Sequence, residues 1–216
     1  VFAKARETKR HVVCITVSST VSSTYQTALS TAKNMSKVMP IPGTINIIDS
    51  QTAAGAYGLA VLAAARAALA GENVDTVINE AQRVIQNVNL LAITNNFWHL
   101  HAGGRLPWIA ALAGSTLKLN PIIEMTKGNI QTIERPRTRE KAMKRLANII
   151  RERIGHKPVV ANVMHAISDA EALSLRDSIR SYVDCAEIIV SDFTPVMGAH
   201  TGTGVIGAAF HSKDTT

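Results

Sequence analysis

Hydroxyl side chains gather in one short stretch between a strand pattern and a helix pattern. Residues 12–17 are apolar and rich in β-branched side chains, which predicts a strand covered on both faces. Before the helical pattern that begins near Tyr25, the chain places Ser18, Ser19, Thr20, Ser22 and Ser23. A helix N-terminus offers unpaired N–H groups and the positive end of the helix dipole, so a carboxylate or phosphate can bind there. The alternative is that one serine simply caps the helix.

A second group of candidate residues lies near the C-terminus. Residues 196–210 place His200, Thr201 and Thr203 among closely spaced glycines, between apolar runs. This pattern predicts a tight loop whose backbone can approach a ligand closely. His200 is either a neutral hydrogen-bond donor to an anion or a histidine of the core. The glycines do not form a dinucleotide-binding G-x-G-x-x-G motif.

An arginine follows a predicted helix end in the middle of the chain. Phe97 to Ala102 reads as a short helix, and the paired glycines Gly103 and Gly104 stop it just before Arg105. The guanidinium of Arg105 either faces an anion or is solvated.

Alternating strand and helix patterns position the hydroxyl stretch. The spacing predicts strands at 12–17, 44–48 and 90–93, separated by helices that start near Tyr25, at Ala53 and at Val74. This order is typical of a parallel, layered α/β sheet, in which ligands bind beyond the carboxyl ends of the strands. We therefore expect the hydroxyl stretch and the Asp49–Ser50 pair to lie at the same edge.

A different pattern begins near Leu117. Residues 117–135 read as a β-hairpin turning at Lys127 to Asn129, and a helix, a strand ending at His165, a helix and a further strand follow. We expect a parallel layered α/β domain over residues 1–113 and a second, smaller α/β domain with a β-hairpin over residues 114–216. The chain opens without Met on a helix-like stretch, Phe2–Ala5, so we expect the first domain to be N-terminally incomplete.

Composition narrows the class of protein. The net charge is +7, and many cations fall within residues 135–153, but aromatic residues make up only 4% of the chain. A basic nucleic-acid-binding module is therefore a weaker alternative. The two cysteines lie in apolar runs without metal-binding spacing, which predicts reduced thiols in a cytoplasmic protein without a metal site. We also expect no cofactor. The Ala-rich run at residues 53–70 contains Arg66 and reads as a buried helix, not a membrane span.

Four motifs occur in this order along the chain: I-T-V-S-S-T-V-S-S-T-Y-Q, I-I-D-S, H-A-G-G-R-L and G-A-H-T-G-T-G-V-I-G-A-A-F. In their order and spacing they resemble the DegV family of bacterial fatty-acid-binding proteins. Between the third and fourth, L-K-L-N-P-I-I-E-M-T-K-G-N-I and R-T-R-E-K-A also fit the hairpin and helix of that family. The resemblance extends over essentially the whole chain.

The resemblance implies a two-domain carrier, not an enzyme, that buries one long-chain fatty acid between its domains. The loaded protein would serve as acyl carrier to a dihydroxyacetone-kinase-like fatty acid kinase subunit, which phosphorylates the bound acid. At the matching positions Ser22 would contact the carboxylate, with Ser19 beside it. The other implied residues are His200 and Thr201 from the second domain, Arg105 near the head group, and Arg137 and Arg139 toward the kinase subunit.

Two departures from the family pattern stand out. The family usually has Gly where this chain has Ser23, and it carries an N-terminal segment, with D-S and T-S-x-x-S motifs, that would precede Val1. A different class of function is an esterase-like hydrolase with Ser22 or Ser19 as nucleophile and His200 as base. The sequence contains no G-x-S-x-G motif to favour it.

Overall fold

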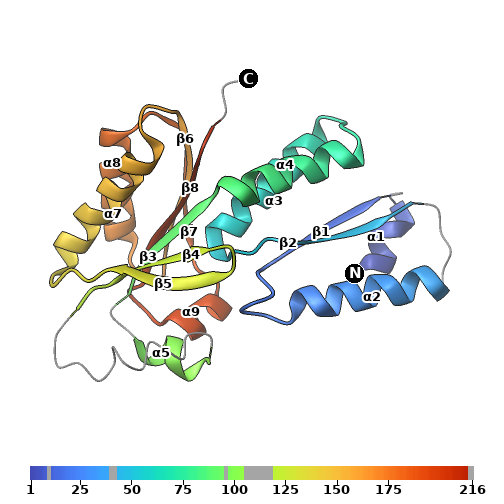
Figure 1. The fold of residues 1–216 in the computed structure, drawn as a ribbon, viewed down its shortest axis with the longest axis horizontal. Helices are drawn as coiled ribbons and strands as arrows, with labels where there is room; N and C mark the ends of the chain where they lie inside the picture. The colour runs from blue at the N-terminus through green and yellow to red at the C-terminus, as the bar shows by residue number, and fades with distance from the viewer. Residues whose placement is uncertain (9–10, 39–42, 95–96, 105–118, 214–216) are drawn as a thin grey trace. The chain divides into compact units, whose positions relative to one another are not determined.

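The computed structural model describes residues 1–213 except for residues 9–10, 39–42, 95–96 and 105–118 (Figure 1). The chain divides into two compact units. The first comprises Val1–Ala53 and Tyr57–Gln86, and the second comprises Ala54–Ala56 and Asn87–Thr216.

The first unit is a two-stranded parallel sheet with helices on both faces. Its elements are α1 (Phe2–Thr8), β1 (Val12–Thr16), α2 (Thr24–Val38), β2 (Ile45–Asp49), α3 (Ala54–Leu69) except for its first three residues, and α4 (Val74–Asn87) except for its last. Strands β1 and β2 pair in register from Val12–Ile45 to Thr16–Asp49. Val13 and Ile15 pack with buried Ala64 and Val77 of α3 and α4, while α2 lies against the sheet and buries Ala28 and Ala32.

Strand β1 borders an apolar groove of about 630 Å³. Four consecutive β1 residues, Val12 to Ile15, line the groove, although their side chains alternate between the two faces of the sheet. Residues of α1, α3 and α4 complete the lining together with Val1, His11 and Glu72, and no β2 residue contributes to it. The groove therefore runs along the edge of β1 opposite β2. Val12 to Ile15 are only half-buried, whereas parallel strands are usually covered on both faces.

The second unit is built on a six-stranded mixed sheet. Its strands are β3 (Asn89–Ile93), β4 (Ile122–Thr126), β5 (Asn129–Glu134), β6 (Val159–His165), β7 (Cys185–Asp192) and β8 (Ile206–Ser212). They are ordered β5-β4-β3-β8-β6-β7, and every described pair is antiparallel except β6–β7. The helices of this unit are α5 (Phe97–Ala102), α7 (Arg139–Ile154), α8 (Asp169–Tyr182) and α9 (Pro195–Thr201).

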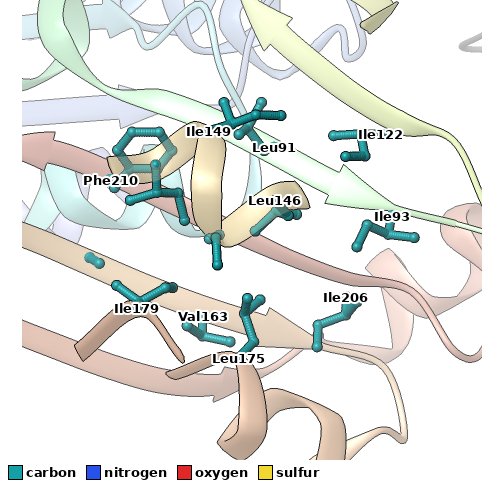
Figure 2. Packing of buried hydrophobic residues seen from close by; sticks show 14 of the residues in the cluster. Leu91, Ile93, Ile122, Leu146, Ile149, Val163, Leu175, Ile179, Ile206 and Phe210 are labelled. Carbon is teal, nitrogen blue, oxygen red and sulfur yellow. The ribbon is translucent and has the colours of Figure 1, made fainter. Parts of the chain in front are cut away.

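One hydrophobic core holds the second unit together. Helices α7 and α8 pack on one face of the sheet, where alternate strand residues such as Leu91, Val163 and Phe210 meet Leu146 and Leu175 of the helices (Figure 2). All five side chains are almost completely buried. The amphipathic spacing of α7 and the alternation along the strands are what bring these residues together.

The predicted α/β class is confirmed, with two differences in detail. Strand β3 was expected to continue the parallel sheet, but it pairs antiparallel with β4 and β8 in the second unit. His200 was expected in a tight loop, but it lies in the last turn of α9, which Thr194 caps through Met197 N–H at 3.4 Å. Pro195 at the first helical position favours this helix.

The predicted domain boundary at 113/114 lies in residues 105–118, outside the described part of the chain. The two compact units divide earlier, between Gln86 and Asn87, because β3 belongs to the sheet of the second unit. The second unit holds more of the chain than the first, whereas the second predicted domain is the smaller one.

We predict that Gly207→Ala strongly destabilises the second unit. A Cβ at Gly207 would lie 2.6 Å from the carbonyl oxygen of Leu91, a backbone atom of the neighbouring strand β3. Relieving this overlap requires β3 and β8 to separate, at a cost of about 3 kcal/mol. Urea unfolding followed by circular dichroism measures the change.

Gly58→Ala is the matched control for that variant. Gly58 lies inside α3, and a Cβ there would meet no atom within 4 Å beyond its chain neighbours and the backbone of its own helix. The added methyl should raise the helix propensity by about 0.5–1 kcal/mol. Equal stability of the Gly207→Ala variant and the wild type would contradict the close approach of β3 and β8.

Candidate functional site

The hydroxyl stretch lies at the carboxyl ends of β1 and β2. Because the two strands are parallel and Thr16 pairs with Asp49, the residues after β1 meet the end of β2. Ser19 donates its backbone N–H to the Asp49 carboxylate at 3.2 and 3.3 Å, and its hydroxyl donates at 2.5 Å. Gln51 N–H donates to the same carboxylate at 2.9 Å. The predicted meeting of the two strand ends is confirmed.

Ser22 stands just before α2 and is half-buried. Its Oγ accepts the backbone N–H of Thr24 at 3.2 Å and lies 2.8 Å from the hydroxyl of Thr24. The first helical hydrogen bond runs from Thr27 N–H to the Ser23 carbonyl, so Ser23 stands at the N-cap position and Ser22 precedes it. The local turn thus uses Ser22 as an acceptor.

Buried hydroxyls fix the shape of this turn from beneath. Ser18 is fully buried, and its Oγ accepts Thr20 N–H at 3.3 Å. Its own backbone N–H donates to the Thr52 carbonyl at 2.8 Å, and Ser50 Oγ donates to that same carbonyl at 3.1 Å. These bonds tie the turn after β1 to the turn after β2, which holds Ser19 and Ser22 on a rigid base.

In the second unit, α5 and α9 lie side by side and bring two predicted motifs together. A Cβ at Gly103, just after α5, would lie 3.2 Å from Nδ1 of His200 in α9. Glycine at this position therefore permits the close approach of the half-buried imidazole. The hydroxyl of Thr201, the other predicted residue here, donates to the Met197 carbonyl at 2.9 Å within α9. Arg105, two residues beyond Gly103, lies outside the described residues.

Arg139 makes contacts inside the second unit. Its guanidinium donates to the two carboxylate oxygens of Glu171 at 2.9 and 2.8 Å, and to the Gly204 carbonyl at 2.8 Å. The side chain thereby links α7 and α8 to the turn after His200. The predicted role of Arg137 and Arg139 toward a partner subunit stays a prediction.

Ion pairs neutralise much of the predicted basic face of α7. Lys144 pairs with Glu140, and Arg145 pairs with both Glu134 and Glu152, each at 2.7 Å. Arg153 pairs with the buried carboxylate of Glu124. A nucleic-acid surface needs cations available for phosphate, so these pairs weaken the nucleic-acid interpretation.

One group within the described part of the chain has the composition of a metal site. Buried His165 and exposed Asp169 and Asp192 place their ligand atoms within 4.8 Å of one another. Nδ1 of His165 accepts the N–H of Ser168 at 3.3 Å, so the ring proton is assigned to Nε2, which faces Asp192 at 3.2 Å. A metal at Nε2 would need that proton on Nδ1, against Ser168 N–H. The contact between the imidazole and Asp192 therefore accounts for the group.

Both cysteines are free and half-buried, and burial raises the pKa of the Cys14 and Cys185 thiols. Such thiols are poor nucleophiles. Among the described residues, we find no helix with the length and apolarity that crossing a bilayer requires.

Taken together, the two sheets define a two-unit α/β protein with hydroxyl groups at parallel strand ends in one unit and an imidazole on a short helix in the other. Within this class, the chain belongs to the DegV family. The family model described as "Uncharacterised protein, DegV family" matches residues 1–213.

A DegV domain-containing protein of Streptomyces coelicolor is 34% identical over 175 residues, which cover 81% of this chain and 62% of the relative. The chain thus spans about three-fifths of the length of the curated relatives it matches. Two solved structures are also similar, and both cover 98% of this chain and 74% of their own. A Thermus thermophilus DegV family protein described for its fatty acid binding has 25% identity and a TM-score of 0.89. Bacillus subtilis DegV, described as a fatty acid binding protein, has 27% identity and a TM-score of 0.81.

We predict that the free energy of unfolding falls below about pH 4.3, the usual glutamate pKa, partly because of Glu124. Burial alone would raise the pKa of Glu124, but hydrogen bonds from Arg153 and Gln131 outweigh it and hold the pKa below its usual range. The folded protein therefore binds fewer protons than the unfolded chain at this carboxyl. The stabilisation is present above the unfolded pKa and is lost as the pH falls through the folded one.

Glu124→Gln should flatten this pH dependence by up to about 1.4 kcal/mol per pH unit, measured by urea unfolding between pH 3 and pH 6. Glu72→Gln, at an exposed position of the first unit, is the control. An unchanged slope in the Glu124→Gln variant would contradict the assignment.

Proposed function

We propose that this chain binds a long-chain fatty acid, with the carboxylate held at the hydroxyl turn after β1. The observation that carries the proposal is the likeness to two DegV family proteins described as fatty-acid-binding, at 25% and 27% identity and over 98% of this chain. The rigid turn at the ends of β1 and β2 supports it, because it presents Ser22 beside a helix N-terminus.

The tail and the head group of the ligand contribute different amounts of binding free energy and therefore have separate roles. Burying methylenes contributes roughly 0.8 kcal/mol each, so a long acyl chain supplies on the order of 10 kcal/mol before ordering costs. A hydrogen bond to a charged group contributes only about 1.5–3 kcal/mol. The tail therefore dominates affinity, while Ser22 and His200 fix the position of the carboxylate.

The finer proposal is that the bound acid is presented to a separate dihydroxyacetone-kinase-like subunit for phosphorylation. In it, His200 and Thr201 contact the head group from the second unit, Arg105 lies nearby, and Arg137 faces the partner. Arg139 also faces the partner in this proposal, while its guanidinium holds the Gly204 carbonyl in the turn that follows His200. This proposal rests on membership of the family.

We predict that Ser22→Ala weakens binding of palmitate about tenfold, because it removes one hydrogen bond to the charged head group. Isothermal titration calorimetry measures the affinity, and native mass spectrometry of the purified wild-type protein detects any lipid that copurifies. Ser30→Ala, at an exposed position of α2, removes a hydroxyl elsewhere in the same unit and is the matched control. Wild-type protein that neither carries an acyl species nor binds palmitate would refute the proposed function.

We further expect the effects of Ser22→Ala and His200→Ala to be non-additive if both residues contact one head group. A double-mutant cycle on palmitate affinity should show a coupling of at least about 0.5 kcal/mol. Fully additive losses would show that the two side chains act independently.

A further inference from the structure

The carboxylate of Asp49 occupies part of the turn that the proposed function assigns to the fatty-acid head group. We propose that Asp49 sets the head-group specificity of this site, by withdrawing Ser19 from ligand binding and by disfavouring additional negative charge. The inference rests on the proposed function and concerns the same turn.

The hydroxyl proton of Ser19 is already used in a hydrogen bond, so Ser19 cannot donate to a ligand. A serine hydroxyl has a single proton, and that of Ser19 is directed to Asp49 at 2.5 Å. The backbone N–H of Ser19 also points to the same carboxylate. Ser19 is exposed, yet it offers a ligand only acceptor lone pairs. A carboxylate ligand has no proton to donate, so it gains nothing from Ser19.

Ser22 is the opposite case. Its Oγ accepts Thr24 N–H, and the Thr24 hydroxyl can also donate to it at 2.8 Å. In that arrangement the proton of Ser22 is available to a ligand. The two serines, three residues apart, therefore differ in what they can offer: Ser22 can donate to a ligand when Thr24 is the donor between them, and Ser19 cannot.

Asp49 also brings a full negative charge to the turn. Among the described residues, its hydrogen-bond donors are the N–H groups of Ser19 and Gln51 and the hydroxyl of Ser19, which orient the carboxylate without neutralising it. An anionic head group at Ser22 shares the turn with this charge and is repelled by it. A doubly charged head group is repelled more strongly, and an uncharged one is not affected. The turn thus selects head groups of low negative charge.

The test compares three ligands that share a hexadecyl-length tail: palmitate, hexadecanol and hexadecyl phosphate. In Asp49→Asn, the amide oxygen still accepts the N–H groups of Ser19 and Gln51, while the amide N–H₂ donates to Ser19 Oγ and frees its proton. Palmitate should bind about fivefold more tightly to this variant. Hexadecyl phosphate should gain more than palmitate, and hexadecanol should change less than twofold. A fold disturbed by the substitution would instead weaken all three ligands together.

Two control variants complete the design. Asp75→Asn removes one negative charge from the first turn of α4 and should change palmitate affinity less than twofold. Asp49→Glu retains the charge and should keep the wild-type preference among the three ligands.

The outcomes separate this inference from the proposed function. Ser19→Ala should alter palmitate affinity less than twofold, and a loss as large as that of Ser22→Ala would overturn the inference. So would an Asp49→Asn variant in which the ratio of palmitate to hexadecanol affinity is unchanged or reduced. Wild-type protein that binds none of the three lipids would refute the proposed function, and the inference with it.

Discussion

The parallel pairing of β1 with β2 is the constraint on which the candidate site depends. Parallel strands end at the same edge, so the turn after β1 and the last residue of β2 become neighbours although they are some thirty positions apart in the sequence. An antiparallel pair would have placed Asp49 at the far end of β1. The hydroxyl turn owes its rigidity to this pairing, because Ser18, Ser50 and Thr52 bridge the two strand ends. Local sequence supplies the side chains, and strand direction gives them their neighbours.

The spacing of apolar residues predicted the helices and strands well, because this spacing reflects which side chains of each element are buried. The apolar positions of α4 and α7 and the Lys127–Gly128 turn all lie where spacing and turn chemistry place them. The neighbours of a strand in its sheet were harder to predict. The sequence of β3 has the same pattern whether the adjacent strands run parallel or antiparallel to it. The glycines around His200 suggested a loop, although the Thr194–Pro195 start signal of a helix was present in the sequence. The sequence predicted that the two strand ends would meet. It did not predict the hydrogen bond between Ser19 and Asp49, because no periodic pattern encodes it.

Carboxylates of the same unit neutralise several of the positive charges along α7. The run of cations along α7 suggested an anionic partner, yet Lys144, Arg145 and Arg153 have carboxylate partners within the same unit. Those partners come from β4, β5 and α7 itself, so the sequence run of positive charge was visible while its compensation was dispersed. Arg139 also donates a hydrogen bond to the Gly204 carbonyl, in the turn that follows α9. The net charge of a segment therefore does not predict the electric field around it until the positions of its ion-pair partners are known.

The apolar groove beside β1 has a consequence for how this chain behaves at high concentration. In the described part of the chain only β2 pairs with β1, so the half-buried residues Val12 to Ile15 along its other edge are a template on which another extended backbone can add, whatever its source. A two-stranded sheet gains much from a third strand, since each new neighbour satisfies backbone N–H and C=O groups and covers Val12 to Ile15 at once. The edge of β1 described here is therefore a surface on which a further extended segment can add.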